Sequence, residues 1–235
     1  MKETSIQYYS HQLGKNIDLA IYGHWGYPVV IFPTSMGRHY EAKDFQLIES
    51  ARTLIEEGKV KVYCVDSIDK DSWYAKHLHP NIRIKNAVLY DNFLNEELVP
   101  YIQNECNTSK VAVAGCSFGG FQAANFAFKH PEKVSDLFTM GAAFDIKDFL
   151  SGYYDDDVYF NNPFDYLPNA QNPSIWNMNI VLGTCSGDFC KAENETLSKV
   201  LAFKNVNHWL DIRWHGTHDW PIWREMFPEY LSKFR

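Results

Sequence analysis

The chain has 235 residues, of which 46% are hydrophobic and 22% charged, and its formal net charge is −7 at pH 7. This length suits one α/β domain over residues 1–235, and the acidic balance argues against a nucleic-acid partner, which requires a basic face. No stretch approaches the roughly 18 apolar residues of a membrane span, and the first residues contain no apolar leader. We therefore expect a cytoplasmic protein without a membrane partner, and the composition leaves its oligomeric state open.

The first half of the chain alternates between apolar runs typical of strands and amphipathic runs typical of helices. Two β-rich runs around the turn at residues 12–15 predict a leading antiparallel hairpin. The repeated alternation that follows predicts an α/β fold, with a mostly parallel sheet covered by helices on both faces. The expected strands here are residues 6–10, 16–22, 28–33 and 59–66, and the expected helices are residues 41–57 and a long one from about 79 to 106.

The most informative segment is residues 111–120, Val-Ala-Val-Ala-Gly-Cys-Ser-Phe-Gly-Gly. A buried apolar run leads into Gly115-Cys-Ser-Phe-Gly119, an Ala-rich helical run follows at residues 121–130, and another strand is expected at residues 134–140. The pattern G-x-S-x-G between a strand and a helix is that of a nucleophile elbow, in which glycines give a strained serine room on both sides. The segment therefore predicts Ser117 as a catalytic nucleophile.

An elbow of this kind predicts an acid later in the chain, just after a strand. Residues 179–184 form a short apolar run typical of a strand, and the turn-forming residues 185–189 after it contain Asp188. Asp188 is therefore the expected acid. Asp145 and Asp66, each after an earlier strand, are alternatives, although aspartates at strand ends often cap helices.

The elbow also predicts a histidine after the acid. Residues 208–214 alternate like a final strand, and His218 follows before the helical pattern of residues 220–234. His215 is the alternative base, but it lies closer to the end of the strand. In the expected mechanism His218 takes the proton of Ser117, and Asp188 holds the imidazole in the required tautomer. Imidazole suits this role because it titrates near neutrality and can act as base and then as acid.

A tetrahedral intermediate needs two backbone N–H donors. One is expected at Phe118, directly after the nucleophile, and the other in the loop that follows the strand at residues 28–33. Within that loop we expect Ser35 to be the donor, with Met36 as the second choice.

Residues 144–177 interrupt the alternation and are rich in aromatic and turn-forming residues. This segment is either a lid over the site or an ordinary surface excursion whose aromatic side chains cover the sheet edge. The three aspartates at residues 155–157 are expected to be solvated rather than to bind calcium. Residues expected to contact substrate, here or near the oxyanion loop, are Met36, Trp73, Tyr74, Tyr153, Tyr154 and Trp220.

No cofactor or metal is expected. The sequence contains neither a Rossmann glycine fingerprint nor a P-loop. The five cysteines are an odd number scattered along the chain, which favours reduced thiols over a disulfide framework. Cys185 and Cys190 flank the expected acid but lack partner ligands at metal-site spacing.

Several of these segments resemble the esterase family of the α/β-hydrolase superfamily, the group that contains esterase D-like enzymes. The resemblance is carried by residues 115–120, by Gly187-Asp188 and by residues 218–223, His-Asp-Trp-Pro-Ile-Trp. Residues 32–39, 65–69 and 153–162 are similar to a small bacterial subgroup of esterase-like proteins. The resemblance implies an α/β-hydrolase fold and a serine hydrolase with Ser117, Asp188 and His218 as its triad. Pro33-Thr34 replaces the usual His-Gly of the oxyanion loop, and Thr217 stands where glycine often precedes the histidine.

The leading hypothesis is a serine esterase that acts on small-molecule carboxylic esters with small or medium acyl or aryl groups. Acyl transfer or thioester hydrolysis on the same triad is the alternative within enzymes. The alternative outside enzymes is a hydrolase-like binding domain in which the three side chains do not converge.

Overall fold

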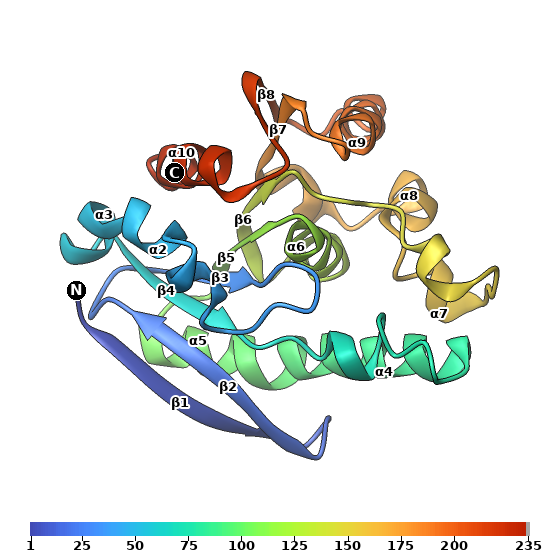
Figure 1. The fold of residues 1–235 in the computed structure, drawn as a ribbon, viewed down its shortest axis with the longest axis horizontal. Helices are drawn as coiled ribbons and strands as arrows, with labels where there is room; N and C mark the ends of the chain where they lie inside the picture. Colours follow the sequence, from blue (N-terminus) through green and yellow to red (C-terminus); the bar gives the residue numbers. More distant parts are fainter. Residues whose placement is uncertain (234–235) are drawn as a thin grey trace.

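The computed structural model describes residues 1–233. Within these residues eight strands form one sheet in the order β1-β2-β4-β3-β5-β6-β7-β8 (Figure 1). The strands are β1 (Glu3–Ser10), β2 (Lys15–Tyr22), β3 (Tyr27–Phe32), β4 (Val60–Val65), β5 (Val111–Cys116), β6 (Val134–Met140), β7 (Asn179–Gly187) and β8 (Trp209–Thr217). β2 pairs antiparallel with β1 and β4, and the remaining neighbours are parallel. The predicted α/β fold with a leading hairpin is confirmed.

Helices cover both faces of the sheet (Figure 1). They are α1 (Glu41–Asp44), α2 (Leu47–Ser50), α3 (Arg52–Glu56), α4 (Pro80–Phe93), α5 (Val99–Cys106), α6 (Phe118–Lys129), α7 (Asp156–Tyr159), α8 (Pro163–Tyr166), α9 (Lys191–Phe203) and α10 (Trp220–Leu231). Shorter turns are η1 (Asp69–Asp71), η2 (Leu94–Leu98), η3 (Lys147–Leu150), η4 (Leu167–Asn169) and η5 (Pro173–Asn177). α1 to α3 and α10 enclose one apolar core with the sheet, whereas α4, α5, α6 and α9 enclose the other. No helix within residues 1–233 is both long and apolar enough for a membrane crossing.

The parallel strands all end at one edge of the sheet, and their following loops carry the polar residues of interest. Ser117 follows β5, Asp188 follows β7 and His218 follows β8. In open α/β sheets this carboxyl edge is where ligands bind, because the loops of neighbouring strands converge there.

The predicted helix at residues 41–57 is instead three short helices. Gln46 adopts a left-handed conformation with φ 63° between α1 and α2. The turn before it lets Phe45 stack on Trp220, with ring centroids 4.7 Å apart and planes at 5°. The break in the helix accompanies a contact with α10, which is distant in sequence. A local apolar pattern therefore could not predict the break.

The predicted long helix at residues 79–106 runs as α4, η2 and α5, and η2 is a π-helical turn. Pro100 follows directly at the start of α5. Proline has no N–H and its ring crowds the carbonyl of the residue four positions earlier, so a wider turn before it relieves the clash.

The C-terminal half departs from expectation at two places. α9 was not predicted from the sequence, and its inward face consists of Asn194, Leu197 and Leu201 among charged neighbours. Residues 144–177 contain only short helical turns, η3, α7, α8, η4 and η5. The last predicted helix is present as α10 up to Leu231, and its expected end at Phe234 lies outside the described residues.

Candidate active site

Ser117 stands at the sharp turn between β5 and α6. Its backbone has φ 54° and ψ −124°, a conformation that is costly for a residue with a side chain. The Ser117 N–H donates to the carbonyl of Met140 at 2.9 Å, which anchors the turn to β6. The side chain is thereby raised at the carboxyl edge of the sheet, as expected for a nucleophile elbow.

The glycines of the elbow pack too closely for any side chain. A Cβ on Gly115 would lie 2.2 Å from the backbone of Gly119, and a Cβ on Gly119 would lie 2.3 Å from the carbonyl oxygen of Phe32. The motif therefore reflects the close approach of α6 to β5 and to the loop after β3.

Ser117, His218 and Asp188 form one hydrogen-bonded chain. The Ser117 Oγ lies 2.8 Å from His218 Nε2, and His218 Nδ1 lies 2.8 Å from Asp188 Oδ1. Because an ionised carboxylate only accepts, His218 Nδ1–H donates to Asp188 and Nε2 is left to accept the serine proton. The His218 and Asp188 side chains are 11% and 1% exposed, so little water competes for these bonds.

Several neighbours fix the histidine and the acid. Asp188 Oδ1 also accepts the N–H of Cys190 at 2.8 Å. A Cβ on Gly141, which has φ 59°, would lie 2.5 Å from Asp188 Oδ2. The rings of Phe189 and Trp223 lie 4.0 Å and 5.1 Å from the imidazole of His218. These neighbours restrict the conformations that the Asp188 and His218 side chains can adopt.

The alternative acids and base are engaged elsewhere. His215 Nε2 lies 2.9 Å from Glu225 Oε2, and Asp145 pairs with Lys147 at 3.3 Å. Asp66 accepts from Arg38 Nε at 2.7 Å. None of these bonds involves Ser117.

Two N–H groups were expected to stabilise the oxyanion, one in α6 and one in the loop after β3. Phe118 is the first residue of α6, so its N–H belongs to the helix turn that lacks intrahelical acceptors. In the loop after β3, the Met36 N–H donates to Asp69 Oδ2 at 2.9 Å and the Thr34 N–H donates to Glu41 Oε2 at 2.8 Å. The Ser35 N–H between them has no acceptor within residues 1–233. Ser35 is thus available as a donor, whereas Met36 is not.

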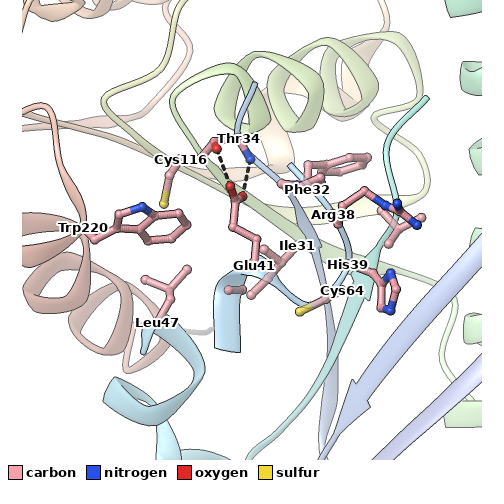
Figure 2. A pocket seen from close by; sticks show the side chains of 13 residues that line it. Ile31, Phe32, Thr34, Arg38, His39, Glu41, Leu47, Cys64, Cys116 and Trp220 are labelled. Atoms are coloured by element: carbon pink, nitrogen blue, oxygen red, sulfur yellow. Dashed lines mark hydrogen bonds between the residues drawn. The ribbon is translucent and has the colours of Figure 1, made fainter. Parts of the chain in front are cut away.

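Two carboxyls lie against this loop, the half-buried Glu41 and the buried Asp69, and neither was predicted from the sequence to be part of the site. Figure 2 shows Glu41 directed at Thr34 in a pocket that Cys116 and Trp220 also line. Burial raises the pKa of Glu41, against the hydrogen bonds from Thr34 that lower it. Burial is also the largest cause that raises the pKa of Asp69, to about 7. The sequence signals for Asp69 were its position shortly after a strand and its place in the segment 65–69 that resembles the bacterial subgroup.

The residues expected to contact substrate lie in different surroundings. Trp73 is only 4% exposed and packs its ring on Phe121 at 5.6 Å, so it belongs to the core. Tyr74 packs on the ring of Phe118, the residue after the nucleophile, with centroids 5.8 Å apart.

The other four expected contacts lie at or near the surface. Met36 is 49% exposed on the loop after β3, and Trp220 lines one side of the pocket of Figure 2. Tyr153 and Tyr154 donate to Asp155 and Asp165, at 2.6 Å and 2.9 Å. Neither of these two hydroxyls is bonded to the triad.

The acidic run at residues 155–157 has a local role. Asp155 accepts the N–H of Val158 at 2.9 Å and so caps α7. Whether residues 144–177 act as a lid stays a prediction.

All five cysteines are free, as the sequence predicted. Asp188, Cys190 and His218 do place donor atoms within 4.8 Å of one another. However, burial, aided by the nearby carboxylates, raises the pKa of the Cys190 thiol to about 12, which keeps it protonated. Both nitrogens of His218 are also engaged in hydrogen bonds. This donor set fits a hydrogen-bonded triad better than a metal, which requires deprotonated ligands.

The sheet topology, the elbow and the order of the three side chains define a class of protein, the α/β-hydrolases. The chain belongs to the family described as "Putative esterase", whose model matches residues 10–234. Family membership places it among the carboxylic-ester hydrolases and confirms the resemblance seen in the sequence.

Solved structures share this fold at low sequence identity. A ferulic acid esterase matches with a TM-score of 0.76 and 15% identity, covering 98% of this chain and 96% of its own. The S-formylglutathione hydrolase of Staphylococcus aureus matches at 0.75 and 16%, covering 98% and 97%. The fluorophosphonate-binding serine hydrolase F of the same organism matches at 0.75 and 17%, also covering 98% and 97%. No curated protein matches the sequence of this chain.

Proposed function

We propose that this protein is a serine hydrolase that cleaves carboxylic esters of small or medium acyl or aryl groups through an acyl-enzyme intermediate. The observation that carries the proposal is the continuous hydrogen-bonded chain from Ser117 through His218 to Asp188. A hydrolase-like domain kept only for binding would not need these three side chains to converge.

In the proposed reaction the Ser117 Oγ attacks the ester carbonyl carbon while His218 Nε2 takes its proton. Asp188 stabilises the imidazolium that forms. When the tetrahedral intermediate collapses, the ester C–O bond breaks and His218 returns the proton to the departing alcohol. Water then attacks the acyl-serine by the same route, giving the free acid and restoring Ser117.

The negative oxygen of the intermediate is proposed to accept from the N–H groups of Phe118 and Ser35. The free N–H of Ser35 supports this choice over Met36, whose N–H is bonded to Asp69. Loss of one such donor typically lowers kcat by about 100- to 1,000-fold.

Aromatic packing beside the nucleophile bears on the acyl group. The Phe118 ring is 2% exposed and contacts Tyr74 and Phe149, at 5.8 Å and 5.1 Å between centroids. These rings cluster around the residue directly after Ser117, and we propose that this bulky cluster limits the acyl group to short chains.

The test combines labelling with turnover. A fluorophosphonate probe should modify Ser117, and p-nitrophenyl acetate and butyrate should be hydrolysed by the wild type but not by Ser117→Ala. Ser198 provides a matched control, because its Oγ lies 2.7 Å from His208 Nε2 but His208 Nδ1 faces the carbonyl of Val206 instead of a carboxylate. Ser198→Ala should keep full turnover, and Ser198 should stay unlabelled. An unlabelled Ser117, or full turnover in Ser117→Ala, would refute the proposal.

Thioester hydrolysis is the second candidate, because the S-formylglutathione hydrolase shares this fold. A short-chain acyl thioester should therefore be included in the substrate panel. A kcat/KM for the thioester well above that for the matched oxygen ester would favour it.

A further inference from the structure

The backbone N–H groups of three consecutive residues in the loop after β3 differ in their hydrogen bonding. Thr34 donates its N–H to Glu41 Oε2 at 2.8 Å and its hydroxyl to Glu41 Oε1 at 2.7 Å. Met36 donates its N–H to Asp69 Oδ2 at 2.9 Å. The Ser35 N–H, between these two anchors, has no acceptor within residues 1–233. The two carboxyls therefore hold the loop on both sides of the free Ser35 N–H group.

The loop is folded tightly around these carboxyls. A Cβ on Gly37 would lie 2.5 Å from Glu41 Oε2, and Met36 is in the left-handed region with φ 59°. Figure 2 shows the Glu41 carboxylate directed at Thr34, with both hydrogen bonds drawn. Such a turn requires the carboxyl partner, because nothing else within the described residues accepts the Thr34 N–H.

Asp69 also reaches the helix that carries the nucleophile turn. Its Oδ1 accepts from Gln122 Nε2 at 3.1 Å, and Gln122 lies one helical turn after Phe118 on α6. Asp69 is 1% exposed, so it exchanges these bonds with water only if the structure opens. A single buried carboxyl thus connects the Ser35 loop to the element that presents the Phe118 N–H.

We propose that Glu41 and Asp69 are positioning residues of the oxyanion hole, which fix the Ser35 N–H relative to the Phe118 N–H. This inference rests on the proposed function. Neither carboxyl touches the substrate; each acts through the backbone of the loop. Oxyanion stabilisation depends on donors held in place before the reaction, because no energy is then spent on reorienting them.

The protonation of Asp69 is compatible with this role. Burial raises its pKa to about 7, and the nearby carboxyls of Glu41 and Asp66 raise it further. The hydrogen bonds from Met36 and Gln122 act in the opposite direction. A carboxyl that is neutral for part of the time opposes a developing oxyanion less than a permanent negative charge would.

The first experiment compares Asp69→Ala with Asp69→Asn by steady-state kinetics on p-nitrophenyl acetate. Asp69→Ala leaves the Met36 N–H without an acceptor, and we expect kcat to fall by about 10- to 100-fold with KM nearly unchanged. Asp69→Asn keeps an oxygen that can accept this N–H, so it should recover most of kcat. A merely structural role would lower only the active fraction of the protein. We therefore calculate kcat per Ser117 titrated with the fluorophosphonate probe, and a structural role would leave that kcat at the wild-type value.

Asp91 provides a matched control. It is a buried carboxyl, 8% exposed, whose partners Lys129 and His130 lie at the far end of α6 from Ser117. Asp91→Asn should lower the melting temperature but keep kcat. An Asp69→Ala protein that is folded and keeps wild-type kcat would overturn the inference while leaving the proposed function intact.

A second measurement does not depend on activity or on the alanine variant folding. Amide hydrogen exchange followed by NMR should find the Thr34 and Met36 N–H groups protected and the Ser35 N–H unprotected. Glu41→Gln should change protection at Thr34, and Asp69→Asn should change it at Met36. Equal, unprotected exchange at all three residues would overturn the inference. Absence of both turnover and Ser117 labelling in the wild type would instead refute the proposed function, and with it the catalytic meaning of the loop.

Discussion

Replacing Ser117 by glycine should stabilise the protein relative to Ser117→Ala, although both variants should be inactive. Ser117 has φ 54° and ψ −124°, and a residue with a Cβ in such a region costs about 1–3 kcal/mol. Glycine removes this strain but loses more backbone entropy on folding, about 0.5–1 kcal/mol. Both variants lose the hydrogen bond to His218, so it cancels in the comparison. The expected net difference is about 1 kcal/mol in favour of glycine.

The assay is urea and thermal unfolding of the two variants side by side. For a domain of this size, 1 kcal/mol corresponds to about 2–4 °C in Tm. Ala202→Gly is the matched control, because Ala202 is exposed in the regular helix α9. In α9 the change from alanine to glycine should lower the free energy of unfolding by about 1 kcal/mol. If Ser117→Gly unfolds more easily than Ser117→Ala, backbone strain at the elbow does not outweigh the entropy that glycine loses on folding, and the reasoning is wrong.

Three further changes test other parts of the structure. Asp188→Asn should lower kcat for p-nitrophenyl acetate by about 10⁴-fold, because an amide favours the wrong imidazole tautomer; a loss below tenfold would contradict the triad. Gly119→Ala should abolish turnover and reduce stability, since its Cβ would lie 2.3 Å from the carbonyl oxygen of Phe32; a crystal structure with an unmoved loop would refute this. Asp91→Ala should destabilise by about 2 kcal/mol, because it removes the carboxylate that pairs with the partly buried Lys129 ammonium, as urea unfolding would measure. Although burial raises the pKa of Asp91, its His130 hydrogen bond and Lys129 lower it overall, so its contribution is present at neutral pH and lost on acidification. The difference between wild type and variant should therefore shrink towards pH 3, and a constant difference would contradict the pairing.

Local sequence patterns were sufficient to predict the strands but insufficient to predict several of the helices. The hairpin and the parallel strands were predictable because their apolar runs are short, β-rich and bounded by turn residues. The break at Gln46 accompanies a stacking contact between Phe45 and Trp220, which are far apart in sequence. α9 was missed because only Leu197, Leu201 and the buried Asn194 mark its inward face. An apolar period cannot reveal a helix that buries an asparagine.

In the site, too, some residues were predictable from a local motif, whereas others depend on contacts between distant parts of the chain. The elbow motif together with chain order selected the three side chains that the structure brings into one hydrogen-bonded chain. Gly141 and Phe189, which lie against the acid and the imidazole, follow strands without any motif of their own. Their relation to the site depends on how neighbouring strand ends are juxtaposed, and that is a property of the sheet order.

Three aspartates in loops after strands illustrate why position alone could not assign roles. Asp66 and Asp69 follow β4 and Asp188 follows β7, and all three are buried. Asp66 faces the Arg38 guanidinium, Asp69 faces the N–H of Met36, and Asp188 faces the imidazole of His218. A guanidinium partner gives an ion pair, a backbone N–H gives a fixed loop, and an imidazole gives a base held in one tautomer. Each role therefore follows from the donor that the fold brings to the carboxyl.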